Sequence, residues 1–318
     1  MAPGIAVTAP LPGSALDRLA GRWPVRVREA ADPMDEEEVA AFIGEAAAAI
    51  TLLSHPVTAR VLEACPRLAV VANYAVGYDN VDVEAARRLG IWVTNTPDVL
   101  TEATADLAWA LILAVTRRLL EGDALVRGGE FRGWEPSLLL GTGLQGKTLG
   151  IVGFGRIGRA VARRAPAFGM EVLHAGRSAR PGAPGRRVGL DELLGESDVV
   201  SLHCPLTPET RHLLDGRRLR SMRRGAVLIN TARGPVVDEA ALVEALRGGH
   251  LGGAGLDVYE HEPEVHPGLL GLPNVVFLPH VGSATVETRS AMADLAAANV
   301  AAVLQGREPP TPVVRGRR

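Results

Sequence analysis

The sequence predicts an α/β protein with two doubly wound parallel-sheet domains, and three observations carry this prediction. The chain has 318 residues, more than one average domain, and its 47% hydrophobic content can fill two cores. Short β-branched apolar runs alternate with helix-patterned segments, as in βαβ units. A glycine-rich turn at Gly153 to Gly158 lies between an apolar strand and an amphipathic helix, which is typical of a dinucleotide-binding domain.

Composition and charge limit the kinds of partner that this chain is expected to bind. The formal net charge is -2, so no overall positive field favours nucleic acid or an anionic membrane, and a small-molecule partner is expected. The apolar run from Leu107 to Thr116 is too short to span a bilayer, and no Lys or Arg precedes Arg18, which argues against a secretory signal. Cys65 and Cys204 lie far apart and match no metal-ligand spacing. We therefore expect a cytoplasmic protein without a metal site or a disulfide.

The first third of the chain is expected to form one open sheet. Its five strands are predicted at residues 5–8, 25–27, 49–53, 69–72 and 91–93. A long helix over residues 102–120 follows, with Thr101 as its N-cap, and can join the two domains. Acidic side chains near its start and Arg117 and Arg118 near its end suit the helix dipole.

A second sheet is predicted from residue 148 onward. Its six strands are expected at residues 148–152, 172–174, 199–202, 226–229, 254–256 and 275–278. An Ala-rich helix over residues 286–304 ends at Gly306. The extended tail after it can return to the first domain.

The glycine-rich turn predicts a pyrophosphate site formed by Gly153, Phe154, Gly155, Arg156, Ile157 and Gly158. Gly153 permits the tight turn, Gly155 lets a pyrophosphate approach the backbone, and Gly158 lets the helix pack on the strand. The N–H groups and positive dipole end of the helix favour an anion there. An ordinary glycine-rich turn is the alternative.

The ribose corner of this site lacks the acid that an NAD site places at the end of the next strand. The nearest acid, Glu171, lies at the wrong end of that strand, and Gly176, Arg177 and Ser178 occupy the corner. An NADP 2′-phosphate would meet a guanidinium and a hydroxyl there, with Arg180 as a further donor. NADP(H) is therefore the expected cofactor. A solvated basic loop that also accepts NAD(H) stays open as the alternative.

Three further clusters follow predicted strands, where open α/β sheets place ligands. They are "NTARG" (230–234), "DVYEHEP" (257–263) and "PHVGSA" (279–284). With "NYAVGYDNVD" (73–82), "NTPDVLTEATADLAWALILA" (95–114), "SDVVSLHCPLTPETRHLL" (197–214) and the glycine-rich turn, they make the chain resemble the D-isomer-specific 2-hydroxyacid dehydrogenases over nearly its whole length. The resemblance implies a Rossmann dinucleotide-binding domain at residues 99–284 and a discontinuous flavodoxin-like substrate domain at residues 1–98 plus 285–318.

The resemblance also implies the catalytic residues. His280 would exchange the proton with the substrate oxygen, and Glu262 would orient its ring and stabilise the imidazolium. Arg233 would bind the substrate carboxylate and stabilise the charge that develops on the oxygen. Taken singly, these three could be a core histidine, one acid of a solvated loop and a surface arginine.

Further binding residues follow from the same resemblance. Backbone N–H groups of Val76 and Gly77 would hold the substrate carboxylate, with Ser54 near the same cleft, and Asp257 would meet the nicotinamide carboxamide. The remaining cofactor contacts implied are Thr104, Cys204, Pro205, Thr210, Thr231, Ala232, Arg233, His280 and Gly282.

The segment "GGEFRGWEPSLLLGTG" (128–143) resembles the glyoxylate and hydroxypyruvate reductase branch of the family. In that branch the tryptophan at the position of Trp134 reaches the active site of a partner subunit, which implies a homodimer; ordinary dimer packing is the alternative. D-lactate or 3-phosphoglycerate stay open as alternative substrates. A dinucleotide-sensing corepressor-like scaffold is the alternative from another functional class. Such scaffolds usually carry extra partner-binding or disordered segments, which are not expected in this chain.

Overall fold

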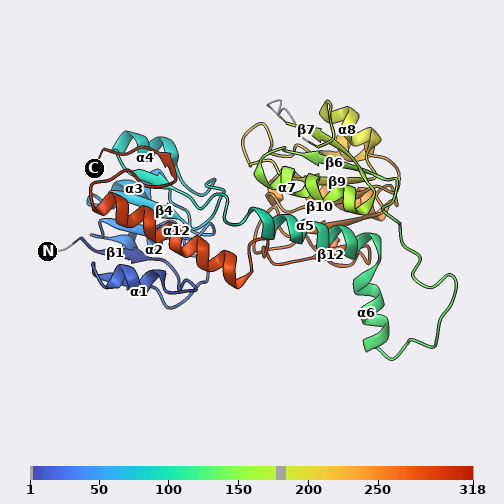
Figure 1. Ribbon diagram of the computed structural model, residues 1–318, viewed down its shortest axis with the longest axis horizontal. Coiled ribbons are helices and arrows are strands. Elements are labelled where there is room, and N and C mark those ends of the chain that lie inside the picture. Colours follow the sequence, from blue (N-terminus) through green and yellow to red (C-terminus); the bar gives the residue numbers. More distant parts are fainter. Residues whose placement is uncertain (1–2, 177–183, 318) are drawn as a thin grey trace. The chain divides into compact units, whose positions relative to one another are not determined.

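The computed structural model of the chain describes residues 3–176 and 184–317. The chain divides into two compact units, which are described separately: unit 1 is Met1–Leu100 with Ser283–Arg318, and unit 2 is Thr101–Gly282 (Figure 1). These bounds lie two residues from the domain bounds expected from the sequence.

Unit 1 is built on a six-stranded sheet in the order β13-β5-β4-β3-β1-β2. Its strands are β1 Ile5–Val7, β2 Val25–Val27, β3 Ala48–Thr51, β4 Val70–Asn73, β5 Trp92–Thr94 and β13 Pro312–Val314. The first five strands are parallel in the flavodoxin-like order 2-1-3-4-5. The tail returns to this unit as expected, where β13 pairs with β5 in the antiparallel sense at the edge of the sheet.

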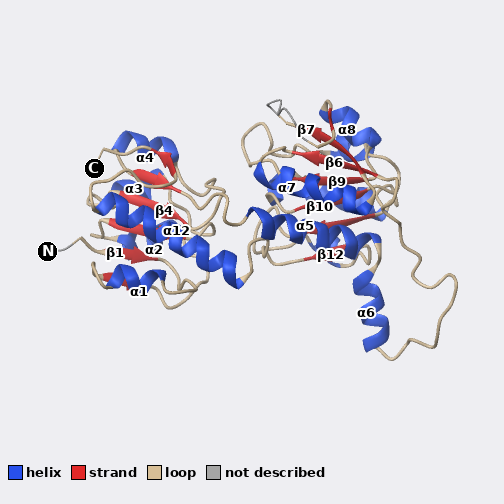
Figure 2. Cartoon of the chain, in the orientation of Figure 1, coloured by secondary structure: helices blue, strands red, loops and turns tan. Residues whose placement is uncertain are grey.

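Helices cover both faces of this sheet (Figure 2). They are α1 Ala15–Ala20, α2 Glu36–Ile43, α3 Ala59–Ala64, α4 Val83–Leu89 and α12 Val286–Leu304. Ala49, Val71 and Val93 share one core with α2, α3 and α4, because alternate strand residues point to the same face. The Ala-rich α12 packs across β3, β4 and β5, and its N-cap Thr285 accepts a hydrogen bond from Thr288 N.

Unit 2 is built on a seven-stranded sheet in the order β12-β11-β10-β9-β6-β7-β8. Its strands are β6 Thr148–Val152, β7 Glu171–Ala175, β8 Arg186–Arg187, β9 Val199–Leu202, β10 Val227–Asn230, β11 Gly253–Leu256 and β12 Val275–Phe277. This is the Rossmann order 3-2-1-4-5-6 with a seventh strand beside the sixth. The expectation of six strands is wrong because β8 consists of two exposed arginines, which carry no apolar pattern.

Two cores lie on the two faces of this sheet. Helices α5 Thr101–Thr116 and α7 Arg156–Arg164 share one core with Val199, Val227 and Ile229. Val200 and Leu228 point to the other face, against α8 Leu190–Glu196, α9 Gly216–Ser221 and α10 Glu239–Arg247. The remaining helices are α6 Leu119–Arg127, α11 Pro267–Leu270 and two short 3₁₀ turns, η1 Ala165–Phe168 and η2 Gly234–Val236.

The helix expected over residues 102–120 is instead two helices. Helix α5 includes Thr101 and ends at Thr116, and Arg118 then adopts a left-handed conformation with φ of +53° before α6 begins. The returning chain blocks further helix, since Thr142 N donates to the carbonyl of Thr116 at 2.8 Å. Arg118 is held by two hydrogen bonds to Glu121, at 2.9 and 2.6 Å.

Candidate active site

The glycine-rich turn joins β6 to α7, as expected. Gly153 has a φ of +92°, and a Cβ there would lie 2.4 Å from the backbone nitrogen of Cys204. A Cβ at Gly158 would lie 2.2 Å from the carbonyl oxygen of Gly153. Both positions therefore require glycine, one for the turn and one for close packing of helix on strand.

Gly155 differs from these two glycines because nothing lies within 4 Å of the position that its Cβ would take. The backbone there is open to a ligand, directly before the first residue of α7, Arg156. Ile157 is partly buried in the core behind it. The turn thus has the open backbone and helix N-terminus that a pyrophosphate needs.

Phe154 packs inward from the same turn. Its ring stacks on His174 of β7, with 3.8 Å between ring centroids and 16° between planes. The backbone is therefore the part of Phe154 that can meet a pyrophosphate.

At the ribose corner, Gly176 follows β7 and packs against the backbone of Phe154. The predicted residues Arg177, Ser178 and Arg180 lie outside the described part of the chain. The structure brings another guanidinium to this corner: Arg187 Nη2 donates to the carbonyl oxygen of Gly176 at 3.0 Å. Sequence reasoning missed Arg187 because the register that places it beside His174 is set by strand pairing.

The loop from Cys204 to Thr210 lies next to the glycine-rich turn. Thr210 Oγ1 donates to the carbonyl of Pro205 at 2.7 Å and accepts from Thr207 N at 2.8 Å, which closes the loop. Burial raises the pKa of the Cys204 thiol to about 11, so this thiol is neutral near pH 7. Cys204 packs in the core of unit 2, and its predicted contact with the cofactor stays a prediction.

Arg233 is held on a turn after β10. The buried side chain of Asn230 accepts a hydrogen bond from Ala232 N at 3.0 Å and donates one to the carbonyl of Arg233 at 2.9 Å. Thr231 is buried on the same turn, and its Oγ1 has no hydrogen-bond partner among the described residues. An orphaned hydroxyl of this kind fits a turn that donates to a bound ligand.

Glu262 and His280 form a hydrogen-bonded pair, with 2.8 Å between Glu262 Oε2 and His280 Nδ1. The other carboxylate oxygen of Glu262 accepts from Tyr259 N at 3.1 Å. This arrangement leaves Nε2 of the histidine as the ring nitrogen that can exchange a proton with a ligand.

The pKa of Glu262 lies below its ordinary value. Burial alone would raise this pKa, but the hydrogen bond and charge of His280, the Tyr259 N–H and the charge of Arg233 together outweigh it. The structure therefore brings the three predicted catalytic residues into one electrostatic cluster.

Asp257 accepts hydrogen bonds from the backbone around His280. It is buried, and its two carboxylate oxygens accept from Val281 N and Gly282 N, each at 2.8 Å, while its carbonyl accepts from His280 N. These bonds hold His280 at a φ of +53°. A Cβ at Gly282 would lie 3.2 Å from Asp257 Oδ2 and 3.4 Å from the buried Thr104, so these three residues lie together. The predicted contact of Asp257 with a carboxamide stays a prediction.

In unit 1, three asparagines hydrogen-bond to the loops that carry Ser54, Val76 and Gly77. Asn73 Nδ2 donates to the carbonyl of Gly77 at 2.7 Å, and Asn80 Nδ2 donates to Asn73 Oδ1 and to the carbonyl of His55. Asn95 Nδ2 holds the carbonyl of Val76 at 2.8 Å.

These bonds use the carbonyl side of the Val76–Gly77 turn. Within residues 3–176 and 184–317, no acceptor is found for the N–H groups of Val76 and Gly77. Two adjacent free N–H groups suit a carboxylate.

The segment from α6 to residue 142 extends away from the body of unit 2 (Figure 1) and is called the arm. Helix α6 buries none of its residues. Trp134, which follows it, is 84% exposed, and Phe131 and Leu140 are exposed as well. The described residues therefore leave these three apolar side chains of the arm largely uncovered.

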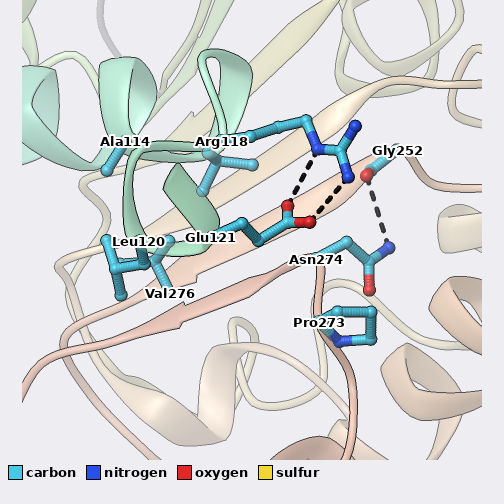
Figure 3. A pocket seen from close by; sticks show the side chains of 9 residues that line it. Ala114, Arg118, Leu120, Glu121, Gly252, Pro273, Asn274 and Val276 are labelled. Carbon is cyan, nitrogen blue, oxygen red and sulfur yellow. Dashed lines mark hydrogen bonds and ion pairs between the residues drawn. The ribbon is translucent and has the colours of Figure 1, made fainter. Parts of the chain in front are cut away.

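A cavity of about 250 Å³ lies at the base of the arm (Figure 3). The Arg118–Glu121 pair and Asn274 line it, and Gly252 and Pro273 lie at the amino ends of β11 and β12. Arg233 and His280 follow the carboxyl ends of strands, so the cavity belongs to the opposite edge of the sheet. It is not part of the catalytic cluster.

Two further properties concern the described residues. They contain no cluster of three or more His, Cys, Asp or Glu side chains arranged to hold a metal ion. None of their helices has both the length and the apolarity that crossing a bilayer requires.

The chain is similar in sequence to proteins of a known family. The family model described as D-isomer specific 2-hydroxyacid dehydrogenase, NAD binding domain, matches residues 109–282. A glyoxylate reductase of Thermococcus onnurineus is 48% identical, over 99% of this chain and 97% of that protein.

Solved structures are also similar. A protein of Thermus thermophilus matches with a TM-score of 0.93 at 53% identity, over 98% of this chain and 100% of that one. An NADPH-dependent glyoxylate/hydroxypyruvate reductase of Sinorhizobium meliloti, in complex with NADP and malonate, matches with a TM-score of 0.89 at 39% identity, over 100% of this chain and 99% of that one.

The Rossmann order of unit 2 and these matches define an oxidoreductase that uses a nicotinamide dinucleotide. The chain belongs to the D-isomer specific 2-hydroxyacid dehydrogenase family.

Proposed function

We propose that this protein reduces glyoxylate to glycolate and hydroxypyruvate to D-glycerate, with NADP(H) as the preferred cofactor and NAD(H) as a second one. The observation that carries the proposal is the hydrogen bond between His280 Nδ1 and Glu262 Oε2, at 2.8 Å. The charge of Arg233 acts on the same carboxylate and helps to lower its pKa. Full-length relatives named glyoxylate reductase support the choice of substrate.

The dinucleotide, when bound, supplies a hydride to the 2-keto carbon. His280 donates a proton from Nε2 to the carbonyl oxygen, while Glu262 holds Nδ1 and stabilises the imidazolium before the transfer. Arg233 binds the substrate carboxylate and stabilises the negative charge that develops on the oxygen. Asp257 fixes the backbone on which His280 lies.

Preference for NADP(H) is supported by the charge at the ribose corner. Strand β7 ends at Ala175, without the acid that would bind an NAD ribose, and the Arg187 guanidinium lies against Gly176. The similarity to a reductase solved with NADP points the same way. Arg177 and Ser178 stay predicted donors to the 2′-phosphate.

The free N–H groups of Val76 and Gly77 are the proposed carboxylate donors of unit 1, with Ser54 on the neighbouring loop. The exposed arm is proposed to pair two copies of the chain in a homodimer, with Trp134 as the residue that enters the partner's active site.

An assay of NADPH oxidation with a panel of 2-keto acids tests the proposal. Hydroxypyruvate and glyoxylate should be reduced with a higher kcat/KM than pyruvate or 3-phosphohydroxypyruvate. Pyruvate turning over as well as hydroxypyruvate would favour a D-lactate dehydrogenase. Cofactor binding without turnover of any 2-keto acid would favour a corepressor-like scaffold.

A further inference from the structure

A buried acid outside the proposed chemistry lies behind the loop that carries Glu262. Glu239 is the first residue of α10, and it is only 4% exposed. Its neighbour Asp238 caps the helix through Ala241 N, so Glu239 is not needed for that role. Burying a carboxylate is costly unless it accepts hydrogen bonds, so its partners indicate what it does.

The partners of Glu239 are the two ends of one loop segment. Glu260 N donates to Glu239 Oε1 at 2.9 Å, and the backbone of His266 also interacts with this carboxylate and lowers its pKa. Glu262 lies between these two residues. A single side chain thus ties both ends of the segment Glu260–His266 to the start of α10.

The outer side of the segment is held by charge. The carboxylate of Glu260 accepts from His212 Nε2, and Arg211 Nη2 lies 3.2 Å from its Oε1. Glu239 itself faces Glu260 and His266. Its pKa is raised mainly by burial and further by the negative charge of Glu260. The backbone donors of the loop offset part of that cost.

Glu239 also connects this loop to the turn that carries Arg233. A Cβ at Gly234 would lie 1.8 Å from the backbone carbon and oxygen of Tyr259, so the two segments are in direct backbone contact. Glu239 follows Gly234 closely along the chain, through η2. The segment that presents Arg233 is therefore the one that fixes the loop of Glu262.

We propose that Glu239 is a positioning residue, whose buried carboxylate binds both ends of the Glu260–His266 segment and so holds Glu262 against His280. The inference rests on the proposed reaction, in which Glu262 stabilises the imidazolium of His280. Its consequence is that the protonation of His280 depends on a side chain that touches neither substrate nor cofactor.

The test compares Glu239→Gln and Glu239→Ala with wild type, with Glu244→Gln as the control on the exposed face of the same helix. Each variant is assayed for kcat against pH in the reduction direction, for NADPH affinity and for Tm. We expect both Glu239 variants to lower kcat by about tenfold and to move the alkaline limb of the profile to lower pH, because a displaced Glu262 stabilises the imidazolium less. NADPH affinity should stay within about threefold.

A double-mutant cycle separates positioning from general support of the fold. If Glu239 acts through Glu262, Glu239→Gln/Glu262→Gln should have the same kcat and the same pH profile as Glu262→Gln alone. A merely structural role would lower Tm with an unchanged pH profile, and additive losses in the double variant would overturn the proposal. The Glu→Gln change preserves shape, so it serves if Glu239→Ala fails to fold.

A readout without turnover keeps this inference distinct from the proposed function. The ring of His280 is titrated by NMR in wild type, Glu239→Gln and Glu264→Gln. The last removes an equal charge from an exposed position of the same segment and leaves the bonds of Glu239 and Glu260 in place. We expect the midpoint to fall in Glu239→Gln and to stay close to wild type in Glu264→Gln. Equal shifts in both would show a charge effect and overturn positioning, whereas inactivity of wild type on 2-keto acids would count only against the proposed function.

Discussion

Glu262 and His280 come from loops after different strands, and their side chains meet with 2.8 Å between Oε2 and Nδ1. The contact fixes which ring nitrogen is free to react. Two backbone hydrogen bonds support the pair: Val281 N donates to Asp257 Oδ1 beside His280, and Tyr259 N donates to Glu262 Oε1. The pair is the basis of the first three predictions.

Replacing His280 with asparagine should lower kcat by about 10²-fold or more, the usual scale for loss of a general acid. Asparagine tolerates the positive φ of this residue, so the change tests chemistry rather than backbone strain. NADPH affinity should remain within a few-fold. His261→Asn, in the exposed part of the neighbouring loop, is the control and should keep wild-type kcat. Retention of half the activity by His280→Asn would end the assignment.

Glu262→Gln should move the alkaline limb of the reduction profile to lower pH, because the imidazolium loses its carboxylate partner. The measurement is kcat against pH at saturating NADPH. An unchanged profile would mean that the 2.8 Å contact does not set the protonation of His280.

The same variant has a consequence for stability. Because the pKa of Glu262 in the fold is below its ordinary value, its carboxylate stabilises the fold above that ordinary value, and this contribution is lost as pH falls through the folded-state pKa. Between about pH 5 and 3, Glu262→Gln should therefore lose less stability than wild type, as urea denaturation can measure.

Gly155→Ala should fold normally and lose NADPH affinity by tenfold or more. A methyl group at this position meets no protein atom within 4 Å, so its cost falls on a ligand that approaches the backbone. Gly195→Ala, in α8 and also without neighbours within 4 Å, is the matched control. Tm and NADPH titration distinguish the two variants, and normal NADPH binding by Gly155→Ala would remove the pyrophosphate from this turn.

Arg187→Gln should weaken the binding of NADPH several-fold more than the binding of NADH. Only NADPH has a 2′-phosphate that can lose a charge-assisted hydrogen bond with Arg187. Arg186→Gln is the control from the adjacent residue, because its guanidinium is paired with Glu192 and Glu196 instead. Affinities for both cofactors are compared by fluorescence titration. Equal losses for NADPH and NADH would show that Arg187 only supports the loop.

Trp134→Phe should reduce the preference for hydroxypyruvate over pyruvate, because the proposed indole N–H would bond the C3 hydroxyl that pyruvate lacks. Leaving such a donor unpaired costs on the order of 1 to 3 kcal/mol, or roughly five- to 150-fold in kcat/KM. Leu140→Ala, another exposed arm residue, is the control. Unchanged discrimination in Trp134→Phe would remove the indole from the explanation.

The sequence by itself determined the two doubly wound sheets and the glycine-rich turn. Alternating apolar runs such as Val199-Val200 and Val227-Leu228-Ile229 are local patterns that specify buried strands, and Gly153 and Gly158 are local demands of one turn. The catalytic cluster came from family motifs, since no local pattern joins Arg233, Glu262 and His280.

Tertiary structure decided the features that depend on neighbours distant in sequence. Strand β8 has no apolar signal and exists because it pairs with β7, which brings Arg187 to Gly176. Helix α5 ends at Thr116 because the chain returning at Thr142 takes its carbonyl. The hold of Glu239 on both ends of the Glu260–His266 segment joins an acid to a loop more than 20 residues further on. Periodicity and propensity describe a residue's own segment, whereas these contacts arise only when segments pack together.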